Sequence, residues 1–142
     1  MEEVKQRIKE HEGYRDTPYA DSLGYGTIGY GHLILPTDDF KEGVSYPKDQ
    51  LEQLFELDFK QALQSADDLL QGLNTNHIVR GIITEMCFQL GKPRCMKFKK
   101  MWEGIQEGNF DKAADEMMDS NWYRQTKKRC GALSAMMRSC NK

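Results

Sequence analysis

Long hydrophobic runs are absent from this chain of 142 residues. The opening residues, MEEVKQRIKEHE, contain no apolar stretch, so we expect no secretory signal peptide. No segment approaches the roughly 20 apolar residues that a membrane-spanning helix needs, so we expect no stable membrane insertion. The chain nevertheless has six Tyr, six Phe and two Trp within 39% hydrophobic residues, which is enough for a folded core.

Cysteine is scarce and irregularly spaced. The four cysteines form no Cys-x-x-Cys pair, and no histidine stands at a metal-ligand spacing from them. The sequence therefore predicts no metal site and no cofactor. Free thiols are the expectation without a secretory signal, although the proximity of the last two cysteines leaves a bridge between them open. The four positions are Cys87, Cys95, Cys130 and Cys140.

Charge is distributed unevenly along the chain. Residues 1–89 carry 8 basic and 16 acidic side chains, whereas residues 90–142 carry 12 basic and 6 acidic ones. The basic half could face a polyanionic surface such as a cell wall, or the two halves could attract each other across a cleft. No nucleic-acid partner is indicated, because the basic run at 127–129 is short and lacks a recognisable module.

The apolar spacing predicts a mainly helical chain. An amphipathic helix is expected over 3–12, a long one over about 47–71, and one that is apolar on several faces over 77–90. Shorter helices are expected at 97–107, 110–119 and 130–139.

Residues 14–34 have a different character, and their glycines and the Ser22-Leu23-Gly24 triplet indicate tight turns in a small antiparallel sheet. Within this segment every second residue from 28 to 34 is large, which predicts that His32 faces inward on its strand. These residues, Ile28, Tyr30, His32 and Ile34, alternate with Thr27, Gly29, Gly31 and Leu33. Three regions of one domain follow: a sheet lobe (about 13–46), a connecting helix (about 47–71), and a helical lobe (about 72–142 plus the helix 3–12).

Glu12 lies on the apolar stripe of the first predicted helix, four residues after Ile8. Burial and the negative end of the helix dipole both favour the protonated carboxylic acid, which is the form that a general acid needs. A solvated glutamate at a helix end is the alternative. Asp21 provides a second carboxylate, and most glycoside hydrolases use a pair of carboxylates for catalysis. Thr27 could hold a water molecule, although turn and strand preferences would also explain these last two residues.

The run IKEHEGYRDTPYADSLGYGTIGYGHLI, residues 8–34, resembles the active-site segment of T-even bacteriophage-type lysozymes, glycoside hydrolase family 24. The resemblance extends through Phe88-Gln89-x-Gly91 and Trp122-Tyr123-x-Gln125-Thr126 over nearly the whole chain. It implies an α+β lysozyme-like fold, with a small antiparallel sheet lobe and a larger helical lobe joined by a long helix.

The resemblance also implies an activity, namely hydrolysis of the β-1,4 bond between N-acetylmuramic acid and N-acetylglucosamine in bacterial peptidoglycan. Glu12 would be the general acid, Asp21 the catalytic carboxylate, and Thr27 the residue that positions water. The family inverts the anomeric configuration, which requires about 6.5–9.5 Å between the carboxyl groups.

Other site residues follow from the same resemblance. His32 and Asp58 would form a structural salt bridge, and Arg129 would hold Glu12 electrostatically. Leu33, Phe88 and Gln89 would contact the substrate, although ordinary packing would also explain the first two.

The chain departs from the family pattern in several places. A helix that usually follows the sheet is replaced by residues 35–46. Glu85 interrupts an otherwise apolar helix, where it could pair with a basic residue or face the cleft. Met101 and Glu116 stand where the family places small or amide side chains, so substrate contacts there are left open.

We expect a monomeric lytic enzyme that is made in the host bacterial cytoplasm. Release by a holin would then bring it to the periplasmic cell wall. A virion-associated lysozyme is an alternative to a free endolysin. Two other hypotheses are a lytic transglycosylase and a catalytically weak wall-binding or structural virion protein. The presence of Asp21 and Thr27 favours hydrolysis over the first, and the presence of both carboxylates argues against the second.

Overall fold

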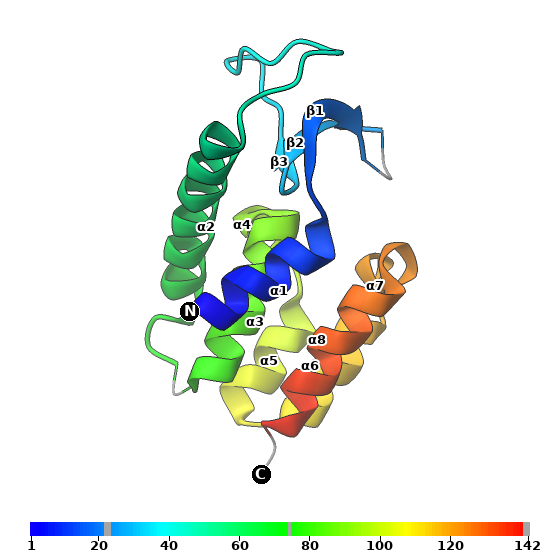
Figure 1. Cartoon of the computed structure of the whole chain (residues 1–142). Helices are drawn as coiled ribbons and strands as arrows, with labels where there is room; N and C mark the ends of the chain where they lie inside the picture. Colours follow the sequence, from blue (N-terminus) through cyan, green and yellow to red (C-terminus); the bar gives the residue numbers. More distant parts are fainter. Residues whose placement is uncertain (22–23, 74, 141–142) are drawn as a thin grey trace. The chain divides into compact units, whose positions relative to one another are not determined.

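The computed structural model describes residues 1–21, 24–73 and 75–140, and the chain divides into two compact units, Met1–Gln61 and Ala62–Lys142 (Figure 1). The turn that the sequence predicts at Ser22-Leu23 lies outside the described residues. The first unit holds one helix, a small sheet and the beginning of a long helix. The second unit holds the remainder of that helix and six further helices of the described part.

Helix α1, Glu2–Glu12, forms where the sequence predicts it. Its buried residues are Val4 and Ile8, four positions apart on one face. The helix ends because Gly13 adopts φ +73°, and the Gly13 N–H donates to the Lys9 carbonyl at 2.9 Å. Glu12 is therefore the last residue of α1, and the direction of this helix determines where Glu12 lies.

Three short strands form an antiparallel sheet in the order β1-β2-β3, namely Arg15–Ala20, Gly26–Gly29 and His32–Leu33. The β1–β2 register is irregular between Arg15 and Tyr19, the stretch that contains Pro18, which has no N–H to donate. The alternating run from 25 to 34 is broken by a turn at Tyr30-Gly31, where Gly31 adopts φ +74°. Ile28 and His32 consequently share a face as cross-strand partners rather than as members of one strand.

Helix α2, Lys48–Leu70, is the longest of the chain and starts directly after Pro47. Its buried positions recur every three or four residues. No helix or strand occurs in residues 34–47, which fits the shortening that the sequence indicated. The buried positions of α2 are Leu51, Phe55, Phe59, Ala62, Ala66 and Leu70.

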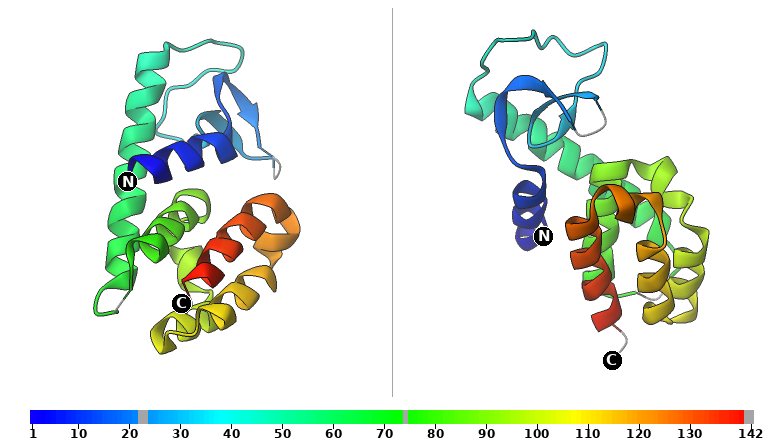
Figure 2. Two further views of the ribbon diagram at one scale, coloured as in Figure 1. Left: turned by 60° about the horizontal axis from the view of Figure 1, so that its bottom comes forward. Right: turned by 90° about the vertical axis from the view of Figure 1, so that its right-hand side faces the viewer.

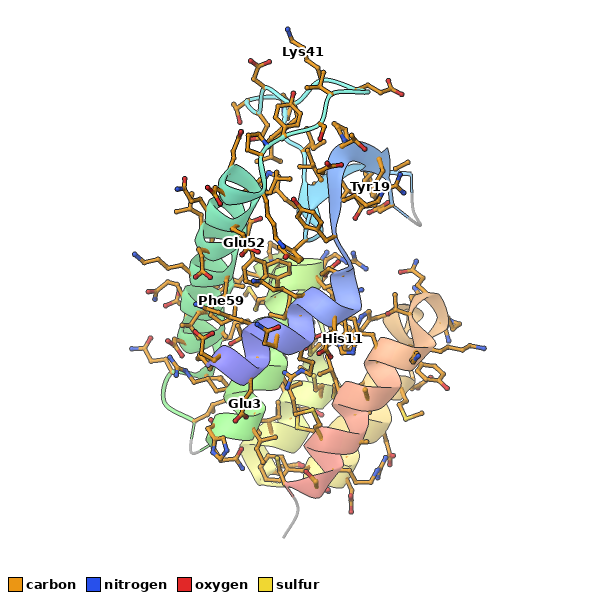
Figure 3. All side chains as sticks on the ribbon, in the orientation of Figure 1. Glu3, His11, Tyr19, Lys41, Glu52 and Phe59 are labelled. Atoms are coloured by element: carbon orange, nitrogen blue, oxygen red, sulfur yellow. The ribbon has the colours of Figure 1, made fainter. Side chains whose placement is uncertain are left out.

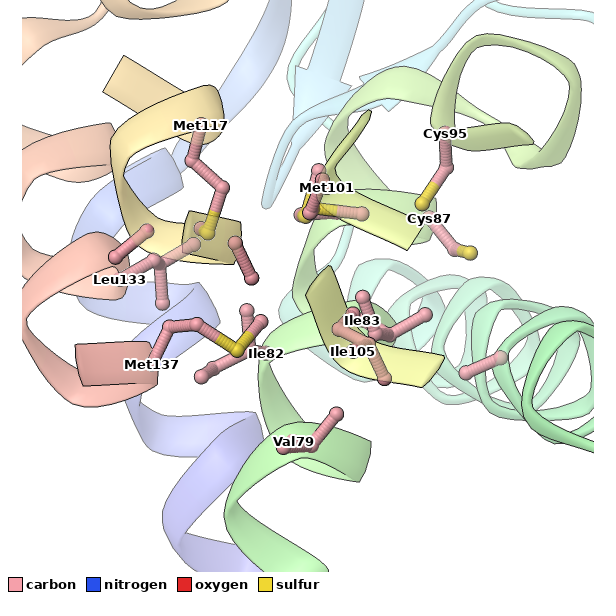
Figure 4. Packing of buried hydrophobic residues seen from close by; sticks show 14 of the residues in the cluster. Val79, Ile82, Ile83, Cys87, Cys95, Met101, Ile105, Met117, Leu133 and Met137 are labelled. Atoms are coloured by element: carbon pink, nitrogen blue, oxygen red, sulfur yellow. The ribbon is translucent and has the colours of Figure 1, made fainter. Parts of the chain in front are cut away.

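Helix α3, His77–Leu90, is the buried centre of the second unit. It begins because the Asn76 side chain accepts from the Val79 N–H at 3.0 Å, and it is buried continuously from Gly81 to Cys87. The expectation of a helix buried on all sides is thereby confirmed. Figure 4 shows the cluster around it, in which Ile82 and Ile83 pack near methionines and leucine from later helices.

Five helices complete the second unit, and Figure 2 follows them from green to red. Helix α6 packs against both α5 and α8. Two of the five helices, α4 and α7, were not predicted from the sequence, and α8 starts earlier than expected. The bounds are α4 Lys92–Met96, α5 Lys99–Glu107, α6 Phe110–Met118, α7 Asn121–Gln125 and α8 Lys127–Ser139.

All four cysteines are free thiols. A Cys130–Cys140 bridge is ruled out by geometry, since ten residues of helix α8 separate the two positions by about 15 Å. Instead Cys130 Sγ lies 3.3 Å from the carbonyl oxygen of Met117. Among the described residues no helix combines the length and the apolar character needed to cross a membrane.

The close approach of α5 and α6 depends on Gly104. A Cβ at this position would lie 2.8 Å from the Ala113 backbone nitrogen and 2.9 Å from the Asn109 carbonyl oxygen. We expect Gly104→Ala to lower the free energy of unfolding by about 1–2 kcal/mol, because overpacking against backbone exceeds the gain in helix propensity. Urea denaturation followed by circular dichroism measures this change.

Gly131→Ala is the matched control, since Gly131 also lies inside a helix but a Cβ there would meet nothing within 4 Å. It should leave stability unchanged or raise it by up to about 1 kcal/mol. Equal stability of the two variants would contradict the close packing at Gly104.

Candidate active site

The end of α1 is held in place by a charged and aromatic cluster on α2 and the sheet. Lys9 Nζ donates to Glu52 Oε2 at 3.0 Å, and the Tyr30 hydroxyl donates to Glu52 Oε1 at 2.9 Å. The Lys9 ammonium also lies 4.9 Å from the ring centroids of both Tyr30 and Phe55. Figure 3 labels Glu52 on α2. Three elements of the first unit thus converge just before Glu12.

Burial and contacts within this cluster shift the pKa values of Tyr30 and Glu52. Burial, followed by the hydrogen bond to Glu52, raises the pKa of Tyr30 to about 12. The hydrogen bond from Lys9 is the main reason that the pKa of Glu52 falls below its usual value. Glu52 therefore stays ionised and Tyr30 stays neutral across the physiological pH range.

Glu12 lies against the turn between β2 and β3. A Cβ built on Gly31 would approach the Glu12 carboxyl group, with Glu12 Cδ only 2.7 Å away. Glycine is needed at position 31 for two reasons. Its φ is +74°, and a side chain would occupy the space that the Glu12 carboxyl group fills. The structure thereby places Glu12 next to the sheet that contains Thr27, and Asp21 directly follows strand β1 of this sheet.

Asp21 and Thr27 are linked through the backbone of one residue, Tyr25. The Tyr25 N–H donates to Asp21 Oδ1 at 2.8 Å, and the Thr27 hydroxyl donates to the Tyr25 carbonyl at 2.9 Å. Thr27 is only 4% exposed, on the central strand β2. Because its proton is used by Tyr25, the Thr27 oxygen is left to accept a hydrogen bond from a water molecule.

Tyr19 is a site residue that the sequence reasoning missed. Burial raises the pKa of its hydroxyl first, and the negative charges of Glu12 and Asp21 raise it further. Tyr19 therefore lies within electrostatic range of both carboxylates. The available signal was its position near the end of strand β1, two residues before Asp21.

His32 bridges two carboxylates on the other side of the sheet. Its Nδ1 lies 2.7 Å from Asp58 Oδ2, so the salt bridge expected from the sequence is present, and its Nε2 lies 2.9 Å from Asp38 Oδ2. Both contacts are hydrogen bonds only when the imidazole carries two protons. Burial alone would lower the pKa of His32, but the two hydrogen bonds and the two negative charges outweigh it and raise the pKa.

Asp38 lies in the irregular segment at residues 34–47. Burial opposes its ionisation, yet its hydrogen bonds from the Leu35 N–H and His32 lower its pKa overall. The segment is thus tied to the sheet and, through His32, to Asp58 on α2. This second carboxylate could not be predicted from the sequence, because its position depends on the path of an irregular loop.

The remaining predicted site residues divide between the two units. Leu33 on β3 is 50% exposed, as a substrate contact requires. Phe88 and Gln89 lie near the end of α3, in the second unit, and both are partly buried. Gln89 Oε1 accepts from Trp122 Nε1 at 2.9 Å, which fixes the amide. A joint role of Leu33 with Phe88 and Gln89 stays a prediction.

Arg129 forms an ion pair inside the second unit. Its Nε donates to Glu85 Oε2 at 2.7 Å, with Glu85 0% and Arg129 7% exposed. Of the two possibilities left open for Glu85 by the sequence, pairing with a basic residue is therefore the one observed. The predicted influence of Arg129 on Glu12 stays a prediction.

The architecture, a small antiparallel sheet followed by a helical unit, defines an α+β protein of lysozyme-like fold. The family model for phage lysozymes matches residues 9–138. The chain therefore belongs to the phage lysozyme family, and it is a lysozyme-type enzyme.

Individual relatives agree with this assignment. "Probable T4-type lysozyme 2" of Dictyostelium discoideum is 29% identical over 89% of this chain and 88% of its own length. "Probable T4-type lysozyme 1" of the same organism is 29% identical over 94% of this chain and 92% of its own length. "Peptidoglycan hydrolase gp36" of Pseudomonas phage phiKMV is 29% identical over 94% of this chain, which corresponds to 15% of that protein.

The raised pKa of His32 leads to a pH-dependent prediction. A group whose pKa is higher in the folded state adds stability that is complete below its unfolded pKa, about 6.5, and is lost as pH rises through the folded value. We expect NMR titration to place the His32 midpoint above 6.5 and Asp38→Asn to lower it. The free energy of unfolding should correspondingly lose the His32 contribution as pH rises from about 6 through that midpoint.

Asp39→Asn is the control, because Asp39 is the exposed neighbour of Asp38 and does not contact the imidazole. It should leave the His32 midpoint within about 0.2 units. A wild-type midpoint at or below 6.5, or equal shifts in both variants, would count against the bridge.

Gly31 allows a test of how Glu12 is seated. Gly31→Ala should abolish most lytic activity, since the new methyl group must displace the Glu12 carboxyl group, and a shift of about 1 Å in a catalytic group can cost about 100-fold in rate. Turbidity loss of permeabilised Gram-negative cells measures the activity.

Gly43→Ala separates this displacement from backbone strain. Gly43 has φ +80°, close to the φ of Gly31, but a Cβ there would meet nothing within 4 Å. Both variants should lose a similar amount of stability from the positive φ, while Gly43→Ala keeps its activity. Similar activity losses in the two variants would show that the Glu12 contact is unimportant.

Proposed function

We propose that this enzyme hydrolyses the β-1,4 bond between N-acetylmuramic acid and N-acetylglucosamine in bacterial peptidoglycan, with inversion at the anomeric carbon. Membership of the phage lysozyme family makes it a lysozyme-type peptidoglycan hydrolase. The proposal adds the bond that is cut, the stereochemical course and the roles of individual residues. Its main support is the link from Asp21 through the Tyr25 backbone to Thr27, beside a sheet turn that seats Glu12.

In this proposal Glu12 is the general acid. It donates its proton to the glycosidic oxygen as the bond to the anomeric carbon breaks. Its place at the C-terminal end of α1 suits a proton donor, since the negative end of the helix dipole opposes ionisation.

Asp21 and Thr27 act on the attacking water. The water donates one hydrogen bond to the Thr27 oxygen and one to the Asp21 carboxylate, which removes a proton as the water oxygen attacks the anomeric carbon. Attack from the face opposite to the leaving group gives a product with inverted configuration. Tyr25 keeps the two groups in a fixed relation, because both of its hydrogen bonds come from its backbone.

Leu33, Phe88 and Gln89 are proposed to contact the glycan, and Arg129 to act electrostatically on Glu12. We further propose that the protein works as a monomer on the cell wall, reached from the host cytoplasm with the help of a holin. A virion-borne enzyme would carry out the same reaction, so the chemistry can be tested without deciding between the two routes.

The acid role predicts the effect of Glu12→Gln. We expect lysis of permeabilised Gram-negative cells to slow by about 10²–10⁴-fold, the usual contribution of general acid catalysis. Glu10→Gln is the matched control, because Glu10 lies on the same helix but is exposed, and it should lyse cells at the wild-type rate. Rapid lysis by Glu12→Gln would refute the assignment of the acid.

The products decide between hydrolysis and transglycosylation. Hydrolysis in H₂¹⁸O should place one labelled oxygen at a reducing N-acetylmuramic acid end, and NMR should detect the α-anomer first. Anhydromuramic ends would indicate a transglycosylase instead. An initial β-anomer would overturn inversion while leaving the hydrolase assignment intact.

A further inference from the structure

Two of the four cysteines are neighbours in the core of the second unit, and neither is among the proposed catalytic residues. Cys87 lies in the last turn of α3 and is 5% exposed, whereas Cys95 lies in α4 and is 0% exposed. The Cys95 thiol donates a hydrogen bond to the Cys87 sulfur. In Figure 4 the Cys95 side chain is directed toward Cys87. The two sulfur atoms are therefore in direct contact.

The backbone between the two cysteines explains this contact. Gly91 ends α3 and precedes the first residue of α4, with φ +84°. Its N–H donates to the Cys87 carbonyl at 2.9 Å, and its carbonyl accepts from the Cys95 N–H at 3.1 Å. Each cysteine is thus one hydrogen-bonded turn away from the same bend, on opposite sides of it.

The hydrogen bond makes the two thiols chemically different. Donation from Cys95 is the main cause that lowers the pKa of Cys87, although burial opposes it, and the Lys92 ammonium lowers the pKa further. The hydrogen bond to Cys87, followed by burial, raises the pKa of Cys95. Cys87 therefore ionises first, and the thiolate is the form of cysteine that attacks a disulfide.

Cys130 is a buried cysteine of the same core whose sulfur contacts oxygen atoms. It lies 3.3 Å from the Met117 carbonyl oxygen and 3.9 Å from Ser134 Oγ. Burial raises the pKa of Cys130 to about 11. A thiol in such surroundings stays protonated and inert, so the different chemistry of Cys87 follows from its pairing with Cys95.

The short helix α4 gives a reagent access to Cys87. It has five residues, and helices of this length have little stability of their own. The residues on either side of Cys95 in the sequence, Arg94 and Met96, are exposed. Local opening of α4 therefore exposes the two sulfur atoms while the rest of the core stays folded.

We propose that Cys87 and Cys95 form a redox site, at which a low-molecular-weight disulfide such as glutathione disulfide joins them in a reversible bond that fixes α4 to the end of α3. The Cys87 thiolate attacks one sulfur of glutathione disulfide, which gives a mixed disulfide and releases one glutathione thiolate. Cys95 then gives its proton to solvent, and its thiolate attacks the Cys87 sulfur and releases the second glutathione. Overall the two protein thiols lose two electrons and two protons, and glutathione disulfide gains them as two thiols.

The same hydrogen bond sets the order of the two steps. In the mixed disulfide the Cys87 sulfur carries no charge, so the charged acceptor that held the Cys95 proton is gone. Cys95 is then easier to ionise. Phe88 and Gln89 directly follow Cys87, so the bond fixes the turn that carries two predicted substrate contacts. The chemistry of the site uses none of the proposed catalytic residues and does not depend on the proposed function.

The test uses the folded full chain with Cys140→Ser as the starting protein, because Cys140 is partly exposed and would react directly. The protein is incubated with glutathione disulfide, alkylated with iodoacetamide and analysed by mass spectrometry. It should lose the mass of two hydrogen atoms, and peptide mapping should find one bond, between Cys87 and Cys95. Dithiothreitol should restore the original mass.

Serine variants of the starting protein assign the two roles. Cys95→Ser should stop at a mixed disulfide on Cys87, with the mass of one glutathione added. Cys87→Ser should add glutathione at least about tenfold more slowly, because the remaining buried thiol stays protonated. Cys130→Ser is the matched control, since it removes a buried thiol of the same core, and it should form the Cys87–Cys95 bond at the rate of the starting protein. Circular dichroism verifies that each variant is folded.

Hydrogen exchange measures whether the bond fixes α4. The Cys95 amide should exchange at least about tenfold more slowly in the oxidised protein, because the bond opposes local opening. The Ala113 amide of α6 should change by less than about twofold. Unchanged exchange at Cys95, a bond that forms only in urea, a bond that includes Cys130, or equal glutathione addition to Cys87→Ser and Cys95→Ser would each overturn the inference.

Discussion

The buried ion pair between Glu85 and Arg129 constrains the arrangement of the whole second unit. Glu85 occupies the middle of α3, which is buried continuously around it, and a carboxylate there is tolerable only with a cationic partner. Arg129 on α8 supplies that partner at 2.7 Å. Because removal of one partner from such a pair typically costs about 3–5 kcal/mol, the position of α8 along α3 is strongly specified.

Much of the second unit follows from this placement. Helix α8 inserts Leu133 and Met137 into the core and brings Cys130 against the end of α6. Helices α6 and α7 are thereby positioned, and Trp122 of α7 reaches Gln89 on α3. The ring contact between Phe98 and Trp122 and one predicted substrate-binding residue, Gln89, are thus fixed by the same set of helix contacts.

The long helices could be predicted because buried positions recur many times along each of them. Helix α3 matches its predicted bounds of 77–90, since eight buried residues and a capping asparagine all indicate the same element. Helices α4 and α7 have five residues each, too few for a period of 3.6 to emerge. The turn at Tyr30-Gly31 could not be predicted, because the alternation of side chains continues across it as it would in an unbroken strand.

The site residues divide in a similar way. Glu12 was predicted from its helical stripe, and its role stays a prediction, whereas the pairing of His32 with Asp58 was predicted from the family resemblance and is confirmed. Asp38 could not be predicted, since it reaches His32 from an irregular loop.

Both units have charged side chains at helix ends where the helix dipole disfavours their charge. In each unit, other contacts stabilise these helices. In the first unit Glu12 stands at the negative end of α1, which is secured a turn earlier by Lys9 and Glu52. In the second unit lysines begin α5 and carboxylates end α6, while the buried cluster that includes Met101, Ala113 and Met117 supplies the stability that these ends lack. A strong core can thus tolerate unfavourable charges at the ends of helices.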